Sequence, residues 1–130
     1  HDAIGYNYRM PNLNAALVCA QLKQLQNYIL NKRQTAGLYA DFCRDNNLNF
    51  LLEVEGCKSN YWLNSIILKD QNEQQDFIRY TNKKGIGTRP SWSLLHKLKI
   101  FKKCFSMPQN NSTFYSERLV NIPSSVRINN

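Results

Sequence analysis

The sequence predicts an α+β domain in which a long N-terminal helix packs on a small sheet. Apolar residues recur at helical spacing over 13–45, which indicates the helix. Two short runs rich in aromatic and β-branched residues follow, and these indicate strands. A capped helical segment and a further strand candidate come next, within a small α+β layer over 46–130. With 130 residues, 42% of them hydrophobic, the chain is long enough for about one domain with its own core.

The first helical segment is the longest in the sequence. Its apolar positions step mostly by threes and fours, at Val18, Leu22, Leu25, Ile29, Ala36, Ala40 and Cys43. Pro11 suits a first helical turn, and Asn12 can cap the helix by accepting a hydrogen bond from a backbone N–H. The pattern predicts one helix, or two in line, over 13–45. Its apolar stripe indicates either core packing or a contact between subunits.

The middle of the chain predicts a hairpin and then a short helix. The segments LNFLLEV (48–54) and NYWLNSIIL (60–68) are the two strands, with Gly56 in the turn. Asp70 and Glu73 match a capping box, and Gly85 suits a left-handed helix end. Phe77, Ile78 and Tyr80 are the expected apolar face of this helix.

The last third of the chain is less regular. IGT (86–88) is a short strand candidate, and Arg89-Pro90 is expected to turn the chain. The segment 89–112 is expected to be irregular with aromatic anchors. Residues 112–126 predict a last short helix followed by an extended exit.

The net charge of +8, from 17 Lys and Arg against nine Asp and Glu, favours an anionic partner. Nucleic acid, a membrane surface and a phosphorylated small molecule all satisfy that condition. The basic residues are spread along the chain, most densely at Lys83-Lys84 and over 97–103. No apolar run approaches the roughly 20 residues that cross a bilayer. The chain begins with His1 and shows no leader pattern, so it is expected to be a piece of a longer protein or a processed product, without a signal peptide.

No complete catalytic or metal-binding pattern is present in the sequence. The four cysteines, at 19, 43, 57 and 104, lack zinc-site spacing and are expected to be free and reduced in the cytoplasm. Cys19 and Cys43 fall in the helical segment and are expected to pack. His1 and His96 are far apart, and neither common glycine-rich phosphate loop occurs.

Three segments resemble the DegT/DnrJ/EryC1/StrS sugar aminotransferases. Over HDAIGYNYRMPNLNAALVCAQLKQL (1–25), the matching positions are Gly5, Tyr6, Asn7, Arg9, Ala15, Ala16, Gln21 and Leu22. GIGTRPSW (85–92), with His96 four residues later, is similar to the family's substrate-side segment. LVNIPSS (119–125) is similar to its closing stretch. The spelling of 1–22 most resembles the subgroup that acts on UDP-linked 4-keto-6-deoxy amino sugars, in bacillosamine- and legionaminic-type pathways.

The resemblance implies the C-terminal small domain of a fold-type I, aspartate aminotransferase-like enzyme that depends on pyridoxal phosphate. Such an enzyme is a cytoplasmic homodimer that transfers an amino group, here from glutamate, to a nucleotide-linked keto sugar. In the family the Schiff-base lysine lies upstream of the GYNYR segment. No lysine of this chain has that context, so the chain alone is expected to be inactive.

The resemblance also implies roles for individual residues. Residues 1–12 are expected to reach the partner subunit's active site, where Asn7 and Arg9 would bind the cofactor phosphate. A helix start favours phosphate, and arginine presents a planar fork to it. Tyr6 and Tyr8 would wall the sugar or ring, and Arg89, Trp92 and His96 would line the nucleotide-sugar pocket.

Plainer roles for these residues remain open. Asn7 could simply hold its loop, and Arg9 could pair with an acid. Trp92 and Arg89 could be packed at a rim, and His96 could be an ordinary surface residue. Two other function classes remain as alternatives, a basic nucleic-acid-binding module and a non-catalytic dimerisation domain. The sugar aminotransferase interpretation predicts neither a nucleic-acid nor a membrane partner.

Overall fold

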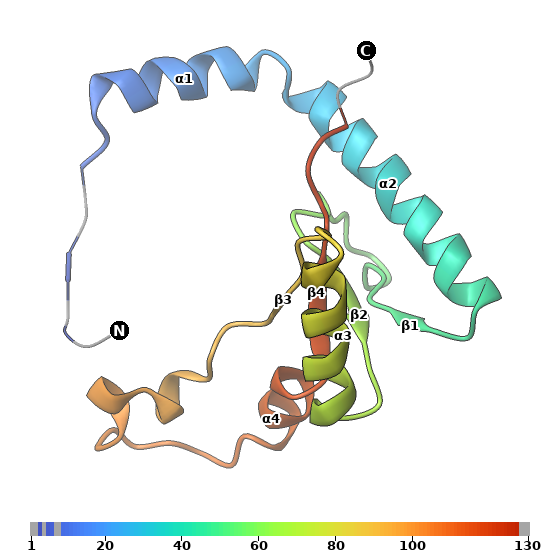
Figure 1. Ribbon diagram of the computed structural model, residues 1–130. Coiled ribbons are helices and arrows are strands. Elements are labelled where there is room, and N and C mark those ends of the chain that lie inside the picture. The colour runs from blue at the N-terminus through green and yellow to red at the C-terminus, as the bar shows by residue number, and fades with distance from the viewer. Residues whose placement is uncertain (1–2, 4, 7–8, 128–130) are drawn as a thin grey trace.

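Four antiparallel strands form one sheet in the order β1-β2-β4-β3 (Figure 1). The computed structural model describes residues 3, 5, 6 and 9–127. Along this part of the chain the elements are α1 (Asn12–Leu22), α2 (Leu25–Asp45), β1 (Asn49–Phe50), β2 (Asn64–Ile67), α3 (Gln71–Lys83), β3 (Arg89–Pro90), the 3₁₀ turns η1 (Leu95–Lys97) and η2 (Lys99–Phe101), α4 (Asn110–Ser116) and β4 (Leu119–Ile122). The α+β prediction is confirmed.

The N-terminal helical segment is two helices that do not run in line. A turn at Lys23 and Gln24 separates α1 from α2, and Figure 1 shows a clear change of direction there. Pro11 occupies the cap position of α1 in an extended conformation, and its carbonyl accepts from the N–H of Ala15 at 3.0 Å. Asn12 is therefore the first helical residue, and no side chain caps α1. The capping role predicted for Asn12 is wrong because Pro11 fills that position.

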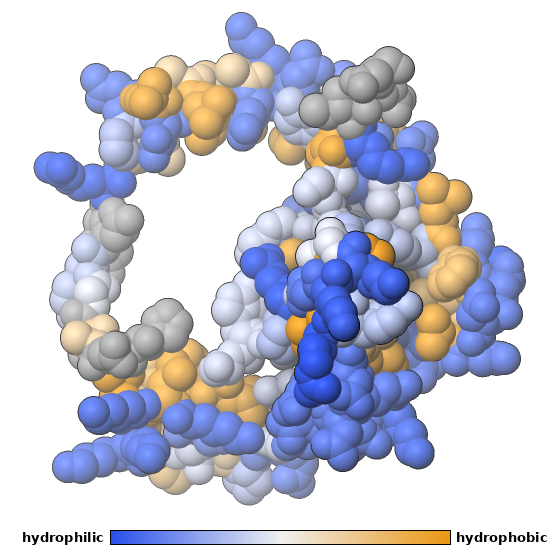
Figure 2. All heavy atoms as spheres, viewed as in Figure 1, coloured by the Kyte–Doolittle hydropathy of each residue, from blue (hydrophilic) through white to orange (hydrophobic). Residues whose placement is uncertain are grey.

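Only the α2 half of the apolar stripe belongs to the core. Ala36 and Cys43 of α2 are buried, whereas α1 buries no residue. Figure 2 shows apolar atoms gathered along α1, which stands away from the sheet. Cys19 is exposed on α1, so its predicted packing is not seen within this chain. The part of the stripe on α2 thus belongs to the core, and the part on α1 is left uncovered by the described chain.

The predicted hairpin is confirmed as a strand pair, but its strands are much shorter than expected. β1 and β2 pair antiparallel, with Asn49 opposite Ile67. Residues 51–63 form a loop between them, in which Gly56 turns the chain with a φ of +77°. Tyr61 and Trp62, which suggested a longer second strand, therefore lie in this loop.

The local signals at α3 are mostly confirmed. The Asp70 carboxylate accepts from the N–H of Glu73 at 3.0 Å, and Glu73 accepts from the N–H of Lys69 at 2.7 Å. Gly85 follows the helix with a φ of +76°, as a left-handed helix end requires. Phe77 and Ile78 pack against the core. Tyr80 is exposed, so its place on the apolar face was predicted wrongly.

The strands of the last third differ most from the prediction. β3 is Arg89–Pro90 rather than 86–88, and these two residues pair with β4 instead of turning the chain. Pro90 is accommodated because β3 is an edge strand, where a missing N–H is tolerated. The expected extended exit is β4, which pairs with β2 on one side and β3 on the other.

The register gives the sheet two different faces. Ile66 lies opposite Val120, and both are buried in a core cluster with Cys43 and Leu68. Ser65, Asn121 and Arg89 form a cross-strand row on the other face, because residues paired across a ladder point the same way. The Ser65 hydroxyl bonds the Asn121 side-chain oxygen at 2.8 Å. One face is therefore apolar and covered, and the other is polar and carries Arg89.

Candidate functional site

Arg89, on the polar face of the sheet, lines a cavity of about 500 Å³, here called the Arg89 cavity. Its walls come from α2, from the end of the 51–63 loop, from the segment before β3 and from the chain at and after β4. They are formed by Lys32, Trp62, Leu63, Gly87, Thr88, Arg89, Asn121, Ile122, Pro123, Ser124 and Ser125. Segments far apart in the sequence thus converge around one arginine.

Two tryptophans stand against each other beside this cavity. The ring centroids of Trp62 and Trp92 are 5.9 Å apart, with the ring planes tilted by 35°. Trp92 lines an adjoining hollow that shares Arg89 and Asn121 with the Arg89 cavity. Both side chains remain more than 60% exposed. A flat, solvent-accessible aromatic surface beside an arginine suits a planar ring or a sugar face that carries a phosphate.

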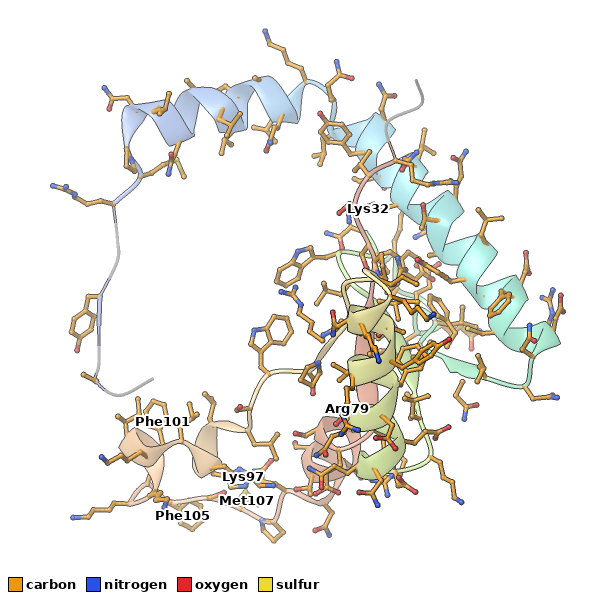
Figure 3. All side chains as sticks on the ribbon, in the orientation of Figure 1. Lys32, Arg79, Lys97, Phe101, Phe105 and Met107 are labelled. Carbon is orange, nitrogen blue, oxygen red and sulfur yellow. The ribbon has the colours of Figure 1, made fainter. Side chains whose placement is uncertain are left out.

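Lys32 adds a second cation to the Arg89 cavity. Its ammonium donates to the backbone carbonyls of Ser124 and, at 3.4 Å, Trp62. Figure 3 places Lys32 between α2 and the chain that leaves β4. Partial burial lowers the pKa of Lys32. An ammonium has three donors, so one N–H remains for a ligand after these two bonds.

Sequence reasoning missed Trp62 and Lys32 as site residues. Trp62 lies in NYWLNS, where its aromatic character was interpreted as a strand signal. Lys32 is a single cation in a helical pattern, and nothing in its local sequence distinguishes it from a solvated lysine. The signal for both is the tertiary packing of α2 against the loop and the chain after β4.

An ion-pair network centred on Arg33 and Glu53 also holds the 51–63 loop to α2. The Arg33 guanidinium bonds both carboxylate oxygens of Glu53, at 2.7 and 3.0 Å, and the carbonyl of Ser59 at 2.6 Å. Glu53 also accepts from the N–H of Ser59 at 2.7 Å. The hydrogen bond from Arg33 and that from the Ser59 N–H hold the pKa of Glu53 at about 2, with a further Coulombic contribution from Arg33 and Lys58.

This network predicts an acid-dependent loss of stability. Because the folded pKa of Glu53 is depressed to about 2 from 4.5, its ionised form stabilises the fold fully above pH 4.5. That contribution is lost as the pH falls toward 2. Urea titrations across this range should therefore show Glu53→Gln less stable than the parent at neutral pH, with the gap closing in acid. Glu55→Gln, on the same loop but exposed, is the matched control. A stability difference between the parent and Glu53→Gln that does not change with pH would contradict the prediction.

His96 does not line the hollows that Arg89 and Trp92 line. His96 lies in η1 and lines a different hollow, of about 700 Å³, together with Phe101, Phe105 and Met107. Figure 3 shows Phe101, Phe105 and Met107 of that hollow well away from Lys32. Of the three residues predicted to share a pocket, the fold brings together the arginine and the tryptophan.

Of the N-terminal candidates, the two that the structure describes, Tyr6 and Arg9, do not line the Arg89 cavity. Asn7 and Tyr8 lie outside the described residues. Tyr6 and Arg9 are exposed, in the segment that leads to α1. Figure 1 shows α1, which follows Arg9, standing away from the sheet. For Tyr6 or Arg9 to share a site with Arg89, a second chain or a further part of the protein would have to bring them together.

The positive charge is not spread evenly along the chain. Residues 77–116 contain eight of the 17 basic residues and none of the nine acidic ones, so the whole net charge of +8 lies there. This stretch includes β3 and Arg89 and ends with α4. Gly87, Thr88 and Arg89 of the cavity wall therefore belong to the most positively charged stretch of the sequence, and such a stretch attracts anionic ligands.

Within residues 3, 5, 6 and 9–127, no cluster of three or more His, Cys, Asp or Glu side chains could hold a metal ion. In the same part of the chain, no helix has the length and apolar character to span a bilayer.

Comparison with known proteins yields one family and several relatives. The profile of the DegT/DnrJ/EryC1/StrS aminotransferase family matches residues 1–130. The chain is 34% identical to GDP-perosamine synthase of Escherichia coli O157:H7 over 107 residues, covering 79% of this chain and 28% of that protein. It is 33% identical to the Vibrio cholerae GDP-perosamine synthase over 129 residues, covering 95% and 35%. The chain therefore spans about a third of the length of these relatives.

Solved structures show the same fold at low sequence identity. Helicobacter pylori PseC, an aminotransferase involved in pseudoaminic acid biosynthesis, superposes with a TM-score of 0.82 at 19% identity, over 98% of this chain and 35% of that one. The putative sugar aminotransferase Spr1654 of Streptococcus pneumoniae gives 0.80 at 16%, over 94% and 32%. The predicted aminotransferase-type fold is confirmed.

Proposed function

This chain belongs to the DegT/DnrJ/EryC1/StrS aminotransferase family, and from that premise we propose that it is the C-terminal portion of a longer sugar aminotransferase. The enzyme would transfer an amino group from glutamate to a nucleotide-linked 4-keto sugar. The observation that carries the proposal is the family match over the whole chain together with the Arg89 cavity. Two cations beside exposed tryptophans suit a ligand with a diphosphate and flat rings.

The residues of this chain would bind and orient the nucleotide sugar. Arg89 would fork onto the diphosphate, with Lys32 as a second donor, and Trp92 would cover a ring or sugar face. His96 would have to act from its own hollow, on a different part of the substrate. The assignment to the UDP-linked subgroup rests on the amino-acid sequence of residues 1–22, whereas two relatives are named for a GDP-linked sugar. Assays should therefore include both nucleotides.

The cofactor of the proposed enzyme is pyridoxal phosphate, which supplies the carbonyl group that carries the amino group between donor and sugar. The N-terminal segment fits the phosphate chemically, since the exposed Arg9 lies two residues before Pro11 and the start of α1. Asn7 and Arg9 would hold that phosphate from across a homodimer. Tyr6 and Tyr8 would wall the same site.

The uncovered apolar face of α1 supports the homodimer. Its large apolar residues Leu13, Leu17, Val18 and Leu22 are exposed in the isolated chain. Such a face is stabilised when it is covered by protein. We also place the enzyme in the cytoplasm, because its cysteines are free and a reducing compartment keeps them so.

The chain alone should not form a covalent adduct with pyridoxal phosphate. The lysine that holds the cofactor in this family lies upstream of the segment that matches residues 1–25, and none of this chain's lysines has its sequence context. Borohydride reduction followed by intact-mass measurement should show no stoichiometric adduct on this chain. The full-length protein, treated in parallel, should gain one cofactor mass. A stoichiometric adduct on the 130-residue chain would contradict the proposal.

The activity test uses the full-length protein with pyridoxal phosphate, glutamate and UDP- or GDP-linked 4-keto sugars. Formation of 2-oxoglutarate that depends on the sugar supports the proposed function. Conversion of glutamate alone, with no sugar aminated from either nucleotide series, would contradict it.

A further inference from the structure

We propose that Arg33 and Glu53 are positioning residues whose ion pair fixes the 51–63 loop so that Trp62 stands against Trp92 as a wall of the Arg89 cavity. The ligand class of this wall, the flat portion of a nucleotide-linked sugar, rests on the proposed function. The positioning itself rests on the contacts of the loop.

The first contacts hold the loop at both ends. Arg33 on α2 binds the Glu53 carboxylate with both ends of its fork, and it binds the Ser59 carbonyl as well. The Glu53 carboxylate accepts a hydrogen bond from the Ser59 N–H. Both backbone groups of Ser59 are thus tied to the same ion pair, three residues before Trp62.

The next contacts set the direction of the chain at Trp62. The Tyr61 N–H donates to the Ser59 hydroxyl at 3.0 Å, and the Tyr61 hydroxyl accepts from the N–H of Glu53 at 3.3 Å. The Arg33 guanidinium lies 5.6 Å from the Tyr61 ring centroid. Tyr61 is buried and has a φ of +45°, a conformation that a residue with a Cβ adopts only when its surroundings enforce it. Buried Tyr61 and exposed Trp62 therefore point different ways, and Trp62 reaches the cavity.

Lys32, the residue before Arg33 on α2, also holds the backbone at Trp62. Lys32 donates to the carbonyl of Trp62 and to that of Ser124, which follows β4. Consecutive residues of α2 thus bind the loop and the cavity wall. Removing the ion pair is expected to release Ser59 and Tyr61, to relax the left-handed backbone at Tyr61, and to separate the two indoles.

The first arm of the test reads the indole pair without any enzyme activity. The chain has two tryptophans, so an indole–indole exciton couplet in its circular dichroism spectrum can come only from Trp62 and Trp92. Trp62→Phe and Trp92→Phe should each abolish the couplet. Arg33→Ala should abolish or strongly reduce it, and the milder Glu53→Gln should reduce it with the helical signal intact. Arg44→Ala removes another ion pair of α2, with Asp41 at 2.9 Å, and should leave the couplet unchanged. A couplet that survives in Arg33→Ala and Glu53→Gln would overturn the positioning.

The second arm is a double-mutant cycle in the full-length enzyme. Trp62→Ala should raise the KM for the nucleotide sugar about tenfold, with the glutamate half-reaction unchanged. Arg33→Ala should raise the same KM severalfold, but it should add nothing further in the Trp62→Ala background. Additive effects would show that Arg33 does not act through Trp62 and would overturn the proposal. If no nucleotide sugar reacts even with the parent enzyme, the proposed function fails, while the couplet still decides whether the ion pair positions Trp62.

Discussion

Replacing Arg89 with alanine in the full-length enzyme should raise the KM for the nucleotide sugar about tenfold to a hundredfold. The side chain lines the cavity beside Lys32 and the tryptophan pair, and its planar fork is the group best suited to a diphosphate there. Losing a hydrogen bond to a charged group costs roughly 1.5–3 kcal/mol, which corresponds to this range. The glutamate half-reaction should change little, because glutamate carries neither diphosphate nor nucleotide. Measuring the two half-reactions separately tests the prediction.

Arg79→Ala is the matched control for this experiment. It removes the same charge from an exposed position on α3, where Arg79 pairs with Asp76 at 2.9 Å (Figure 3). It should leave both half-reactions unchanged. Equal damage by Arg89→Ala to the two half-reactions, together with a lower melting temperature, would mean that the β3 segment is scaffolding and not a substrate site.

Replacing Ile66 with alanine should lower the free energy of unfolding by about 2–5 kcal/mol. Ile66 is 3% exposed at the centre of the sheet, opposite Val120, which is fully buried. The deleted methyl and methylene groups pack in the cluster formed with Cys43 and Leu68, and a covered site between sheet and helices has little freedom to collapse. Urea denaturation of the parent and variant chains, followed by the helical signal in circular dichroism, measures the change.

Ile86→Ala is the matched control, because it makes the same truncation at an exposed position. Ile86 is 48% exposed in the segment before β3, so its truncation should change stability by about 0.5 kcal/mol or less. Similar losses for the two variants would contradict the placement of the core at β2 and β4.

Local chemistry accounts for the parts of the fold that the sequence predicted well. Asp70 and Glu73 need only neighbouring backbone groups to cap α3, and Gly85 needs only its own freedom to adopt positive φ. Gly56 turns the 51–63 loop for the same reason. The α2 half of the apolar stripe buries Ala36 and Cys43, because a helical period presents one face to whatever the helix packs on.

Long-range pairing decided the arrangement that local signals missed. β4 becomes an inner strand only because β2 and β3 bind its two edges, and those partners are distant in sequence. A two-residue strand such as Arg89–Pro90 has no periodicity to detect, and its proline suggests a turn until an edge position accommodates it. The direction of α1 likewise depends on a turn at Lys23 and Gln24, neither of which breaks a helix by itself.

The candidate site divides in the same way. The sequence by itself determined that a basic, arginine- and tryptophan-containing segment follows α3, and the motifs around Asn7, Arg9 and Arg89 carried the family resemblance. Only the tertiary structure decided that Trp92 meets Trp62, that Lys32 joins Arg89, and that His96 lies in another hollow. The physical reason is that these contacts join α2, the 51–63 loop and the segment at and after β3, which are far apart in the sequence. The antiparallel sheet and the half-buried Arg33–Glu53 ion pair bring these segments together.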